Sequence, residues 1–403
     1  MTAHRRAFLR LLALGSGALA ACRQKAAETA AKLPSLLGAP VSTYGERSPF
    51  VKAARQFAET TRTPEQASSL TPLADTYGII TPSSLHFERH HSGVPAIDPA
   101  AHRLLIHGLV ERPLVFAVEE LKRLPSTSRI HFLECSGNSG TGWRPTPRPT
   151  VQAAHGLTSC SEWTGVRLSL LLDEVGVKRD AAWMLAEGAD PGKMTRSIPI
   201  AKALGDAMVV HAQNGEPLRP EQGFPLRLLL PGWEGNSNVK WLRRLKLVDQ
   251  PYMTREETSK YTDLMPDGSA RQFTFTMDAK SVVTHPSGGQ QLAGPGFHEI
   301  SGLAWSGRGK VARVEVSTDG GATWHDAVLQ EPVLPIAHTR FRFAWDWDGT
   351  EAIVASRVTD ETGYVQPTRA ELVAVRGVNS QYHNNMIQAW RVKADGTVDY
   401  AVL

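Results

Sequence analysis

The pattern of apolar residues changes near residue 270, and this change constrains the fold more than any other feature of the chain. Between residues 77 and 248, strand-like runs at 103–108 and 129–133 alternate with helix-like runs at 168–175 and 200–204. Alternation of this kind is typical of helices and strands packed around one core. Beyond residue 270, short β-like runs follow one another with turn residues between them. We therefore predict an α+β fold, in which a mixed α/β core is followed by an all-β domain.

The C-terminal region has the pattern of a β-sandwich. Residues 311–318 are rich in valine and are followed by the turn Asp319-Gly-Gly, which predicts a hairpin. Residues 341–347 place an aromatic side chain at every second position. A stretch of about 100 residues with such runs predicts an immunoglobulin-like sandwich. The expected boundaries are a leader at 1–21, a linker and N-terminal arm at 22–75, the mixed core at 76–265 and the sandwich at 266–403.

Composition excludes several classes of protein. A hydrophobic content of 41% and a charged content of 21% are ordinary for a folded protein. Without the three arginines of the leader, 41 basic residues stand against 40 acidic ones, so nothing favours nucleic acid as a partner. Cys22, Cys135 and Cys160 are too few and too far apart for a disulfide framework or a Cys-x-x-Cys zinc site. Because the sequence has no Cys-x-x-Cys-His motif, we expect no haem in this chain.

The N-terminus resembles an export signal. Arg5 and Arg6 precede an apolar stretch at residues 11–21, which is shorter than the roughly 20 residues that span a bilayer. A twin-arginine pair in this position resembles the signal that exports folded proteins, often with a cofactor inserted, and predicts a periplasmic location. A disordered basic tail and a signal for export of unfolded chains are the alternatives. Leu19-Ala-Ala-Cys22 also resembles a lipoprotein signal, in which Cys22 would carry a lipid anchor.

The segment His131-Phe-Leu-Glu-Cys-Ser-Gly-Asn-Ser-Gly140 is the first candidate for chemistry. An apolar strand delivers Cys135 into a turn of small residues. Small side chains leave room for a bulky cofactor, and a thiolate is a soft ligand that suits a soft or high-valent metal. The alternative is that Cys135 is a small buried hydrophobic residue at the end of a strand.

Three neighbouring segments are interpreted as structural. The alternate prolines of residues 144–149 predict an extended loop that walls the site. Cys160 matches no metal-ligand spacing with Cys135, so we expect a structural thiol. The run Trp163-Thr-Gly-Val is predicted to open a helix at the edge of the site.

A second segment, residues 221–241, places an apolar strand between two polar turns, which taken alone is typical of a central strand. Together with the cysteine turn and the stretch from Ile198-Pro-Ile to Gly215-Glu-Pro-Leu, it resembles the sulfite oxidase family of molybdopterin enzymes. The resemblance runs in order from about Tyr77 to the C-terminus and includes the sandwich, which mediates dimerisation in that family. It implies a molybdenum–molybdopterin cofactor in the mixed core.

The resemblance places Cys135 at the position of the cysteine that ligates molybdenum, as the only protein ligand to the metal. Residues 87–91 match a motif that usually reads Arg-Asn-His, with His90 in place of Asn, and Gln222 replaces a common histidine. A cofactor phosphate needs fixed cationic donors, although single cations in such turns are usually solvated surface charges. The residues implied to bind the cofactor are Arg89, His90, His91, Cys135, Asp190, Gln222, Arg227, Asn238, Val239 and Lys240.

The substrate side of the site is implied to contain Arg89, Tyr261 and Arg391. Cations suit an anionic sulfur oxyacid, and a phenol can donate a hydrogen bond to an oxo group. The alternative for Tyr261 is a rim tyrosine that packs against the sandwich. Where free-sulfite oxidases of the family carry an arginine, this chain has Ser139-Gly140, which weakens the case for free sulfite as the substrate.

Residues 134–139 and 257–268 look most like the SoxC-type molybdenum subunit of sulfane dehydrogenase. This resemblance implies a sulfane sulfur on a carrier protein as the substrate, with sulfite as the other possibility. It also implies electron transfer to a c-type cytochrome and a homodimer or heterotetramer. The alternatives are a periplasmic sulfoxide (methionine sulfoxide) reductase of the same fold, which often lacks the sandwich, and a non-catalytic exported binding module.

Overall fold

A computed structural model of the protein describes residues 40–58, 63–144 and 146–403. The chain divides into two compact units, residues 1–52 and 53–403, and all elements named below belong to the second. The twin-arginine pair, Cys22 and the first part of the expected linker lie outside the described residues. Within the described ranges, no helix has the length and apolar character needed to cross a membrane.

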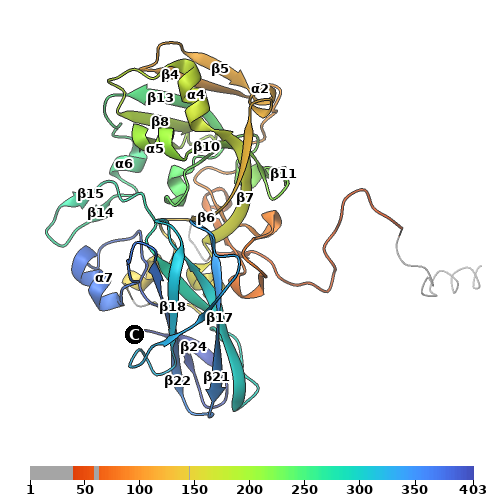
Figure 1. Ribbon diagram of the computed structural model, residues 1–403, viewed down its shortest axis with the longest axis vertical. Helices are drawn as coiled ribbons and strands as arrows, with labels where there is room; N and C mark the ends of the chain where they lie inside the picture. Colours follow the sequence, from red (N-terminus) through yellow and green to blue (C-terminus); the bar gives the residue numbers. More distant parts are fainter. Residues whose placement is uncertain (1–39, 59–62, 145) are drawn as a thin grey trace, which may run out of the picture. The chain divides into compact units, whose positions relative to one another are not determined.

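One layer of the mixed core is a five-stranded sheet with helices beside it (Figure 1). Its order is β5-β4-β13-β8-β9, and only β4 and β13 run parallel. Leucines of α4 pack with those of β13 in one buried cluster. The strand predicted at 103–108 and the helices predicted at 168–175 and 200–204 are confirmed. The bounds are β4 Arg103–Gly108, β5 Leu114–Ala117, α2 Val118–Lys122, α4 Leu168–Val175, β8 Trp183–Gly188, β9 Thr195–Pro199, α5 Ile200–Gly205 and β13 Leu242–Val248.

The second sheet of the core carries the cysteine turn. Its order is β11-β10-β7-β6, with β12 paired to β10, and its strands are β6 Ser126–Glu134, β7 Thr158–Arg167, β10 Met208–Gln213, β11 Glu216–Pro217 and β12 Arg227–Leu229. Strands β6 and β7 pair from Ser126 opposite Val166 to Glu134 opposite Thr158. Strand β6 contains the predicted run at 129–133 and ends at the residue before Cys135. The turn therefore begins where the pairing stops.

The helix predicted at Trp163 is wrong, because Trp163 lies within β7 and α4 begins only at Leu168. Most of β7 is buried on both faces, so its sequence lacks the alternation that marks a half-exposed strand. Gly165 permits a close approach to β10, because a Cβ atom there would lie 2.2 Å from the backbone oxygen of Val209.

Three short strands precede the two sheets of the core; two of them lie within residues 22–75, expected to be a linker and arm, and the third lies inside the expected core. Strands β1 Gln56–Phe57, β2 Ser68–Leu70 and β3 Glu88–Arg89 form a small antiparallel sheet, and all of β2 is buried. Strands of two or three residues carry no periodicity, so the sequence did not predict them. The sheet matters for the site because β3 ends at Arg89.

The all-β region consists of two antiparallel sheets around one core, as the sandwich prediction required (Figure 1). One sheet has the order β16-β17-β21-β20 and the other β19-β18-β22-β23-β24. The predicted hairpin after residue 311 and the aromatic strand at 341–347 are confirmed. The strands are β16 Lys280–His285, β17 Gly296–Trp305, β18 Val311–Ser317, β19 His325–Asp326, β20 Val328–Gln330, β21 Thr339–Trp347, β22 Ala352–Asp360, β23 Ala389–Val392 and β24 Val398–Ala401.

Short elements connect these layers. Among the described residues, the other α-helices are α3 Val151–His155, α6 Arg255–Thr258 and α7 Arg369–Arg376, and β14 Asp263–Leu264 pairs with β15 Ala270–Arg271. The short 3₁₀ helices are η1 Pro64–Gln66, η2 Leu73–Asp75, η3 Ser83–Leu85, η4 Gly140–Trp143, η5 Pro220–Gln222 and η6 Gly235–Ser237.

The sandwich fixes the end of β6 through buried polar contacts. Nζ of Lys280 on β16 donates to Oε1 of Glu134 at 2.9 Å, and Nε1 of Trp305 on β17 donates to Oε2 at 2.7 Å. Each of the three side chains is at most 1% exposed. Because Glu134 directly precedes Cys135, the second domain holds the cysteine turn in place.

Candidate active site

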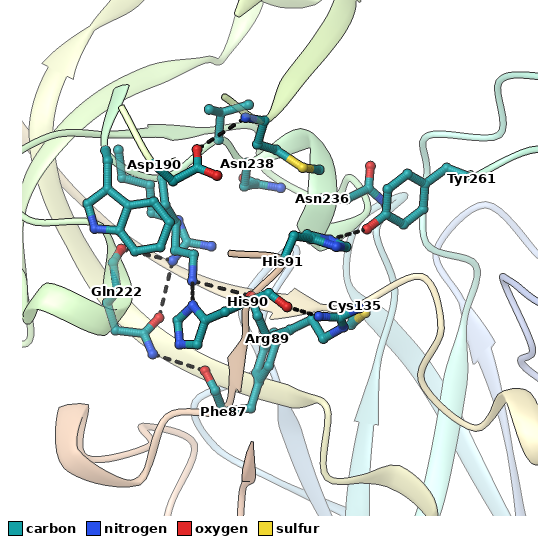
Figure 2. A pocket seen from close by; sticks show the side chains of 16 residues that line it. Phe87, Arg89, His90, His91, Cys135, Asp190, Gln222, Asn236, Asn238 and Tyr261 are labelled. Atoms are coloured by element: carbon teal, nitrogen blue, oxygen red, sulfur yellow. Dashed lines mark hydrogen bonds between the residues drawn. The ribbon is translucent and has the colours of Figure 1, made fainter. Parts of the chain in front are cut away.

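Cys135 faces a pocket that is partly open to solvent (Figure 2). Of the residues that the sequence assigned to the site, all except Arg391 line this one pocket. The lining consists of Phe87, Arg89, His90, His91, Cys135, Asp190, Met194, Gln222, Arg227, Gly235, Asn236, Asn238, Val239, Lys240, Trp241 and Tyr261.

The backbone around Cys135 is held on both sides. The amide of Cys135 donates to the Leu157 oxygen at 3.0 Å, and its own oxygen accepts from the Asn138 amide at 2.8 Å. Gly235 packs against the turn so closely that a Cβ atom there would lie 2.9 Å from the Glu134 oxygen. The Cys135 side chain is therefore directed into the pocket by a rigid turn.

Without a metal ion, the surroundings of Cys135 favour its neutral thiol. Burial raises the pKa of the Cys135 thiol, and the positive charge of Arg89 opposes this effect. A coordinated metal ion deprotonates such a thiol outright. In the described part of the chain, no group of three or more His, Cys, Asp or Glu side chains could hold a metal ion.

Two cations of the pocket have no acidic partner. Arg227 is 4% exposed, and its Nη1 donates only to the backbone and side-chain oxygens of Gln222, at 3.1 and 3.2 Å. Nζ of Lys240 donates to the oxygens of Arg89 and Glu221. Within the described ranges, no carboxylate lies within 4.0 Å of either cation. Burial lowers the pKa of Arg227 to about 9 and that of Lys240 well below its usual value. Partly desolvated cations without a counterion fit a phosphate group.

The two departures from the family pattern, His90 and Gln222, orient these cations. Nδ1 of His90 lies 2.8 Å from Nζ of Lys240, and Nε2 lies 2.8 Å from Oε2 of Glu88. Burial and the charge of Lys240 lower the pKa of His90, so the ring is neutral and accepts from Lys240 at Nδ1. Nε2 of Gln222 donates to the Phe87 oxygen at 2.9 Å, which directs Oε1 toward Arg227. His90 and Gln222 therefore each hold one cation of the pocket in place.

Asp190, Asn238 and Val239 form the buried wall of the pocket, each at most 3% exposed. The Asp190 carboxylate accepts from the hydroxyl of Ser92 at 2.9 Å and from the Met194 amide at 3.1 Å. Oδ1 of Asn238 accepts from the Leu230 amide at 2.6 Å, which fixes the turn after β12. A carboxylate held in this way can also accept from the N–H groups of a pterin.

Arg89, His91 and Tyr261 line the same pocket. Nη1 of Arg89 donates to the Gln66 oxygen at 3.1 Å and also contacts the His90 oxygen. The phenol oxygen of Tyr261 lies 2.8 Å from Nε2 of His91 (Figure 2). Burial raises the pKa of Tyr261, so the phenol keeps its proton at neutral pH. Tyr261 thus lines the pocket and is not confined to the rim.

The assignment of Arg391 to the substrate side is wrong in this structure. Arg391 lies on β23, its side chain is 49% exposed, and its Nε is 3.5 Å from Oε1 of Glu351. Its neighbours Trp390 and Val392 are fully buried. Because successive side chains of a strand point to opposite faces, Arg391 must point to solvent.

The structural predictions near the turn have different outcomes. Cys160 is fully buried in β7, and burial raises its pKa to about 12, which confirms a structural thiol. The described residues of the proline-rich loop do not wall the pocket of Cys135. Arg144, Thr146 and Arg148 line a separate cavity on the other side of the cysteine turn, because η4 carries the chain away first.

Sequence reasoning missed several residues around the pocket. Trp241 and Asn236 line it, and Lys240 lies 4.5 Å from the ring centroid of Trp241. Arg196 and Glu234 lie behind it as a buried ion pair, with Nη2 and Oε1 3.0 Å apart. Asn236 and Trp241 lie beside the predicted Asn238-Val-Lys run, which could have indicated them. No pattern in the sequence distinguishes Arg196 or Glu234.

Comparisons with known proteins agree with this geometry. Residues 91–256 match the oxidoreductase molybdopterin binding domain, and residues 271–390 match the Mo-co oxidoreductase dimerisation domain. The sulfite oxidase of Gallus gallus is 31% identical over 75% of this chain and 71% of its own length. The chain spans 32% of the similar NADH nitrate reductase of Ulva prolifera and 48% of the mitochondrial sulfite oxidase of Drosophila melanogaster.

A solved structure extends the likeness over nearly the whole chain. The sulfane dehydrogenase SoxCD from Paracoccus pantotrophus is 48% identical, with a TM-score of 0.89. The match covers 92% of this chain and 96% of that one.

Proposed function

Because this chain belongs to the sulfite oxidase family, we propose that it oxidises a reduced sulfur centre in the pocket of Cys135. The observation that carries the proposal is the convergence of Cys135, Arg89 and Tyr261 with two unpaired cations in one pocket. Molybdenum analysis and steady-state assays with sulfur substrates test it. A chain that carries molybdenum but oxidises no sulfur compound would contradict it.

Molybdenum–molybdopterin is the cofactor, and the residues present fit it. Cys135 would hold the metal, Arg227 and Lys240 the phosphate, and Asp190 the pterin. Bound there, the cofactor would supply the two-electron redox chemistry.

The remaining work falls to side chains on the substrate side. Each two-electron step adds one oxygen atom from water to the sulfur and releases two protons. Arg89 binds the anionic sulfur group and offsets the negative charge that grows as oxygen is added. Tyr261, protonated at neutral pH, donates a hydrogen bond to the oxygen being transferred, while His91 fixes the direction of the phenol.

We propose a sulfane sulfur on a carrier protein, not free sulfite, as the substrate. With Arg391 on the sandwich surface, Arg89 is the arginine left on the substrate side of the pocket. A free dianion that must be held without a covalent carrier needs more cationic donors than a sulfur tethered to a protein. The structural likeness to a sulfane dehydrogenase supports the same choice.

Comparing kcat/KM for the two substrates tests which of them the enzyme prefers. We expect kcat/KM for a persulfide-bearing carrier protein to exceed that for free sulfite under the same conditions. If sulfite is the better substrate by this measure, the enzyme is a sulfite dehydrogenase and the carrier proposal is wrong.

We propose a c-type cytochrome as electron acceptor. The similar structure is the sulfane dehydrogenase SoxCD, and the sequence of this chain has no Cys-x-x-Cys-His haem-binding motif. The dimerisation domain at residues 271–390 supports a homodimer or a heterotetramer with the cytochrome. Purification from the native source followed by haem spectroscopy and light scattering tests both statements.

The rival functions make distinct predictions. A methionine sulfoxide reductase would consume electrons and would not reduce cytochrome c in the presence of a sulfur donor. A non-catalytic binding module would contain no molybdenum. The dimerisation domain, which such reductases often lack, favours the oxidase direction.

We also propose export to the periplasm in folded form, supported by the Arg5-Arg6 pair before a short apolar stretch. Replacing both residues with lysine should leave the enzyme in the cytoplasm. Fractionation measures this result, and mass spectrometry of the exported protein determines whether Cys22 carries a lipid.

A further inference from the structure

The position of Tyr261 is not set by regular secondary structure. The residue lies between α6 and β14, and its φ of 52° places it in the left-handed region that side chains rarely adopt. A residue in this conformation persists only when its surroundings hold it. The contacts of its ring therefore determine where the phenol points.

Arg196 provides the charged contact with this ring. Its guanidinium carbon lies 5.1 Å from the ring centroid of Tyr261, and its side chain is fully buried on β9. The same guanidinium pairs with two carboxylates: Nη2 is 3.0 Å from Oε1 of Glu234, and Nε is 3.4 Å from Oε1 of Glu257. A cation over an aromatic face attracts the ring most strongly where water is excluded.

Glu234 continues the chain of contacts to the cysteine turn. Its Oε2 accepts from Nδ2 of Asn236 at 2.9 Å and lies 3.1 Å from Nε2 of His383. Nδ2 of Asn236 also reaches the hydroxyl of Ser136 at 3.0 Å, and the amide of His383 donates to the Ser136 oxygen at 2.7 Å. Since Ser136 follows Cys135, these contacts join the phenol to the metal ligand.

The charge state of Glu234 supports this arrangement. Burial raises the pKa of Glu234, but Arg196, His383 and Asn236 outweigh it and lower the pKa to about 2. The carboxylate is thus ionised at neutral pH and can only accept hydrogen bonds. Packed apolar side chains would stabilise the fold as well as a buried ion pair, so stability does not explain the pair.

We propose that Arg196 and Glu234 are a positioning pair, which holds the phenol of Tyr261 at a fixed place relative to Cys135. The pair touches neither the substrate nor the cofactor pocket and acts through Tyr261. This inference rests on the proposed function, because it assigns the pair to the step in which Tyr261 acts.

A double-mutant cycle tests whether Arg196 acts through the phenol. The variants are Arg196→Gln, Tyr261→Phe and the two combined, measured in the full-length, molybdenum-loaded enzyme for kcat, molybdenum content and thermal stability. We expect Arg196→Gln to lower kcat roughly three- to thirtyfold, the range of a desolvated cation–π contact. In the Tyr261→Phe background the same change should lower kcat less than about twofold, since the group it positions is gone.

Arg357→Gln is the matched control. Arg357 pairs with Glu315 at 2.8 Å and lies 4.5 Å from the ring centroid of Trp324, but on the sandwich. We expect Arg357→Gln to leave kcat unchanged with and without the Tyr261 phenol. This result would show that loss of an arginine from an aromatic ring does not by itself lower kcat.

The outcomes separate the inference from the proposed function. If Arg196→Gln lowers kcat by the same factor with and without the phenol, Arg196 is a structural residue and the inference is wrong. If Tyr261→Phe alone leaves kcat intact, the role of Tyr261 fails first, and the inference falls with it.

A second variant covers loss of folding. If Arg196→Gln is unfolded because Glu234 is left buried and unpaired, the pair Arg196→Gln/Glu234→Gln removes both charges. We expect this double variant, measured in the same cycle, to lower kcat only when the phenol of Tyr261 is present. An effect independent of Tyr261 would overturn the inference.

Discussion

The phenol oxygen of Tyr261 and Nε2 of His91 lie 2.8 Å apart although 170 positions separate them in sequence. The sequence assigned the two residues to different parts of the site, one to the substrate and one to the cofactor. Because the phenol keeps its proton, it can donate into the pocket while its oxygen accepts from Nε2–H of His91. The contact therefore connects the two halves of the site.

Tyr261→Phe should lower kcat about a hundredfold with molybdenum content unchanged, because it removes one preorganised donor to developing charge. Steady-state assays and metal analysis on the same sample measure both quantities. Tyr77→Phe is the control, since Tyr77 is 91% exposed and outside the pocket. Equal kcat for wild type and Tyr261→Phe would remove the phenol from the reaction.

Lys240→Met should lower the molybdenum content of the purified protein, because it removes a cation assigned to the cofactor phosphate. Lys202→Met is the matched control: Lys202 also lies over a tryptophan, 5.2 Å from the ring centroid of Trp233, but outside the pocket. Elemental analysis compares the two. If both variants retain wild-type molybdenum, Lys240 does not hold the cofactor.

The longer strands and helices and the cysteine turn were predictable because each shows a periodic pattern of apolar residues or a specific motif. The aromatic alternation at 341–347 marks a strand that is half buried, and the helix at 168–175 buries Leu168, Leu171, Leu172 and Val175 on one face. The cysteine turn was predicted for two reasons. Small residues follow an apolar strand there, and the same segment resembles the family motif.

The errors have physical causes that single residues illustrate. Strand β7 is buried on both faces, so its sequence shows no alternation around Trp163. Arg391 was assigned by resemblance, although the buried Trp390 and Val392 beside it already imply that it points outward. The sequence did not single out Arg196 and Glu234, because burial of an ion pair depends on partners distant in sequence.

Glu234→Gln should destabilise the protein most above pH 4.5 and progressively less toward pH 2. The folded-state pKa of Glu234 is about 2, below its ordinary value of 4.5. A depressed carboxyl pKa contributes stability above the unfolded-state value, and that contribution is lost as pH falls through the folded-state value. Urea denaturation of both proteins across this range measures the difference. A gap that stays constant with pH would show that Glu234 is not held as a carboxylate.

Gly165→Ala should destabilise the protein by roughly 1–3 kcal/mol, because its Cβ would lie 2.2 Å from the Val209 oxygen and force β7 and β10 apart. Gly205→Ala at the end of α5 is the control, since nothing lies within 4 Å of a Cβ there. That change should be neutral or stabilising. Chemical denaturation measures both, and equal stabilities would contradict the close packing of the two strands.

X-ray absorption at the molybdenum edge of wild type and Cys135→Ser tests the central claim, that Cys135 is the protein ligand to the metal. We predict that the variant keeps its circular dichroism spectrum, loses one sulfur ligand at molybdenum and loses sulfur oxidation, because a hydroxyl replaces a soft thiolate poorly. A Cys135→Ser protein with the same number of sulfur ligands and wild-type activity would contradict it.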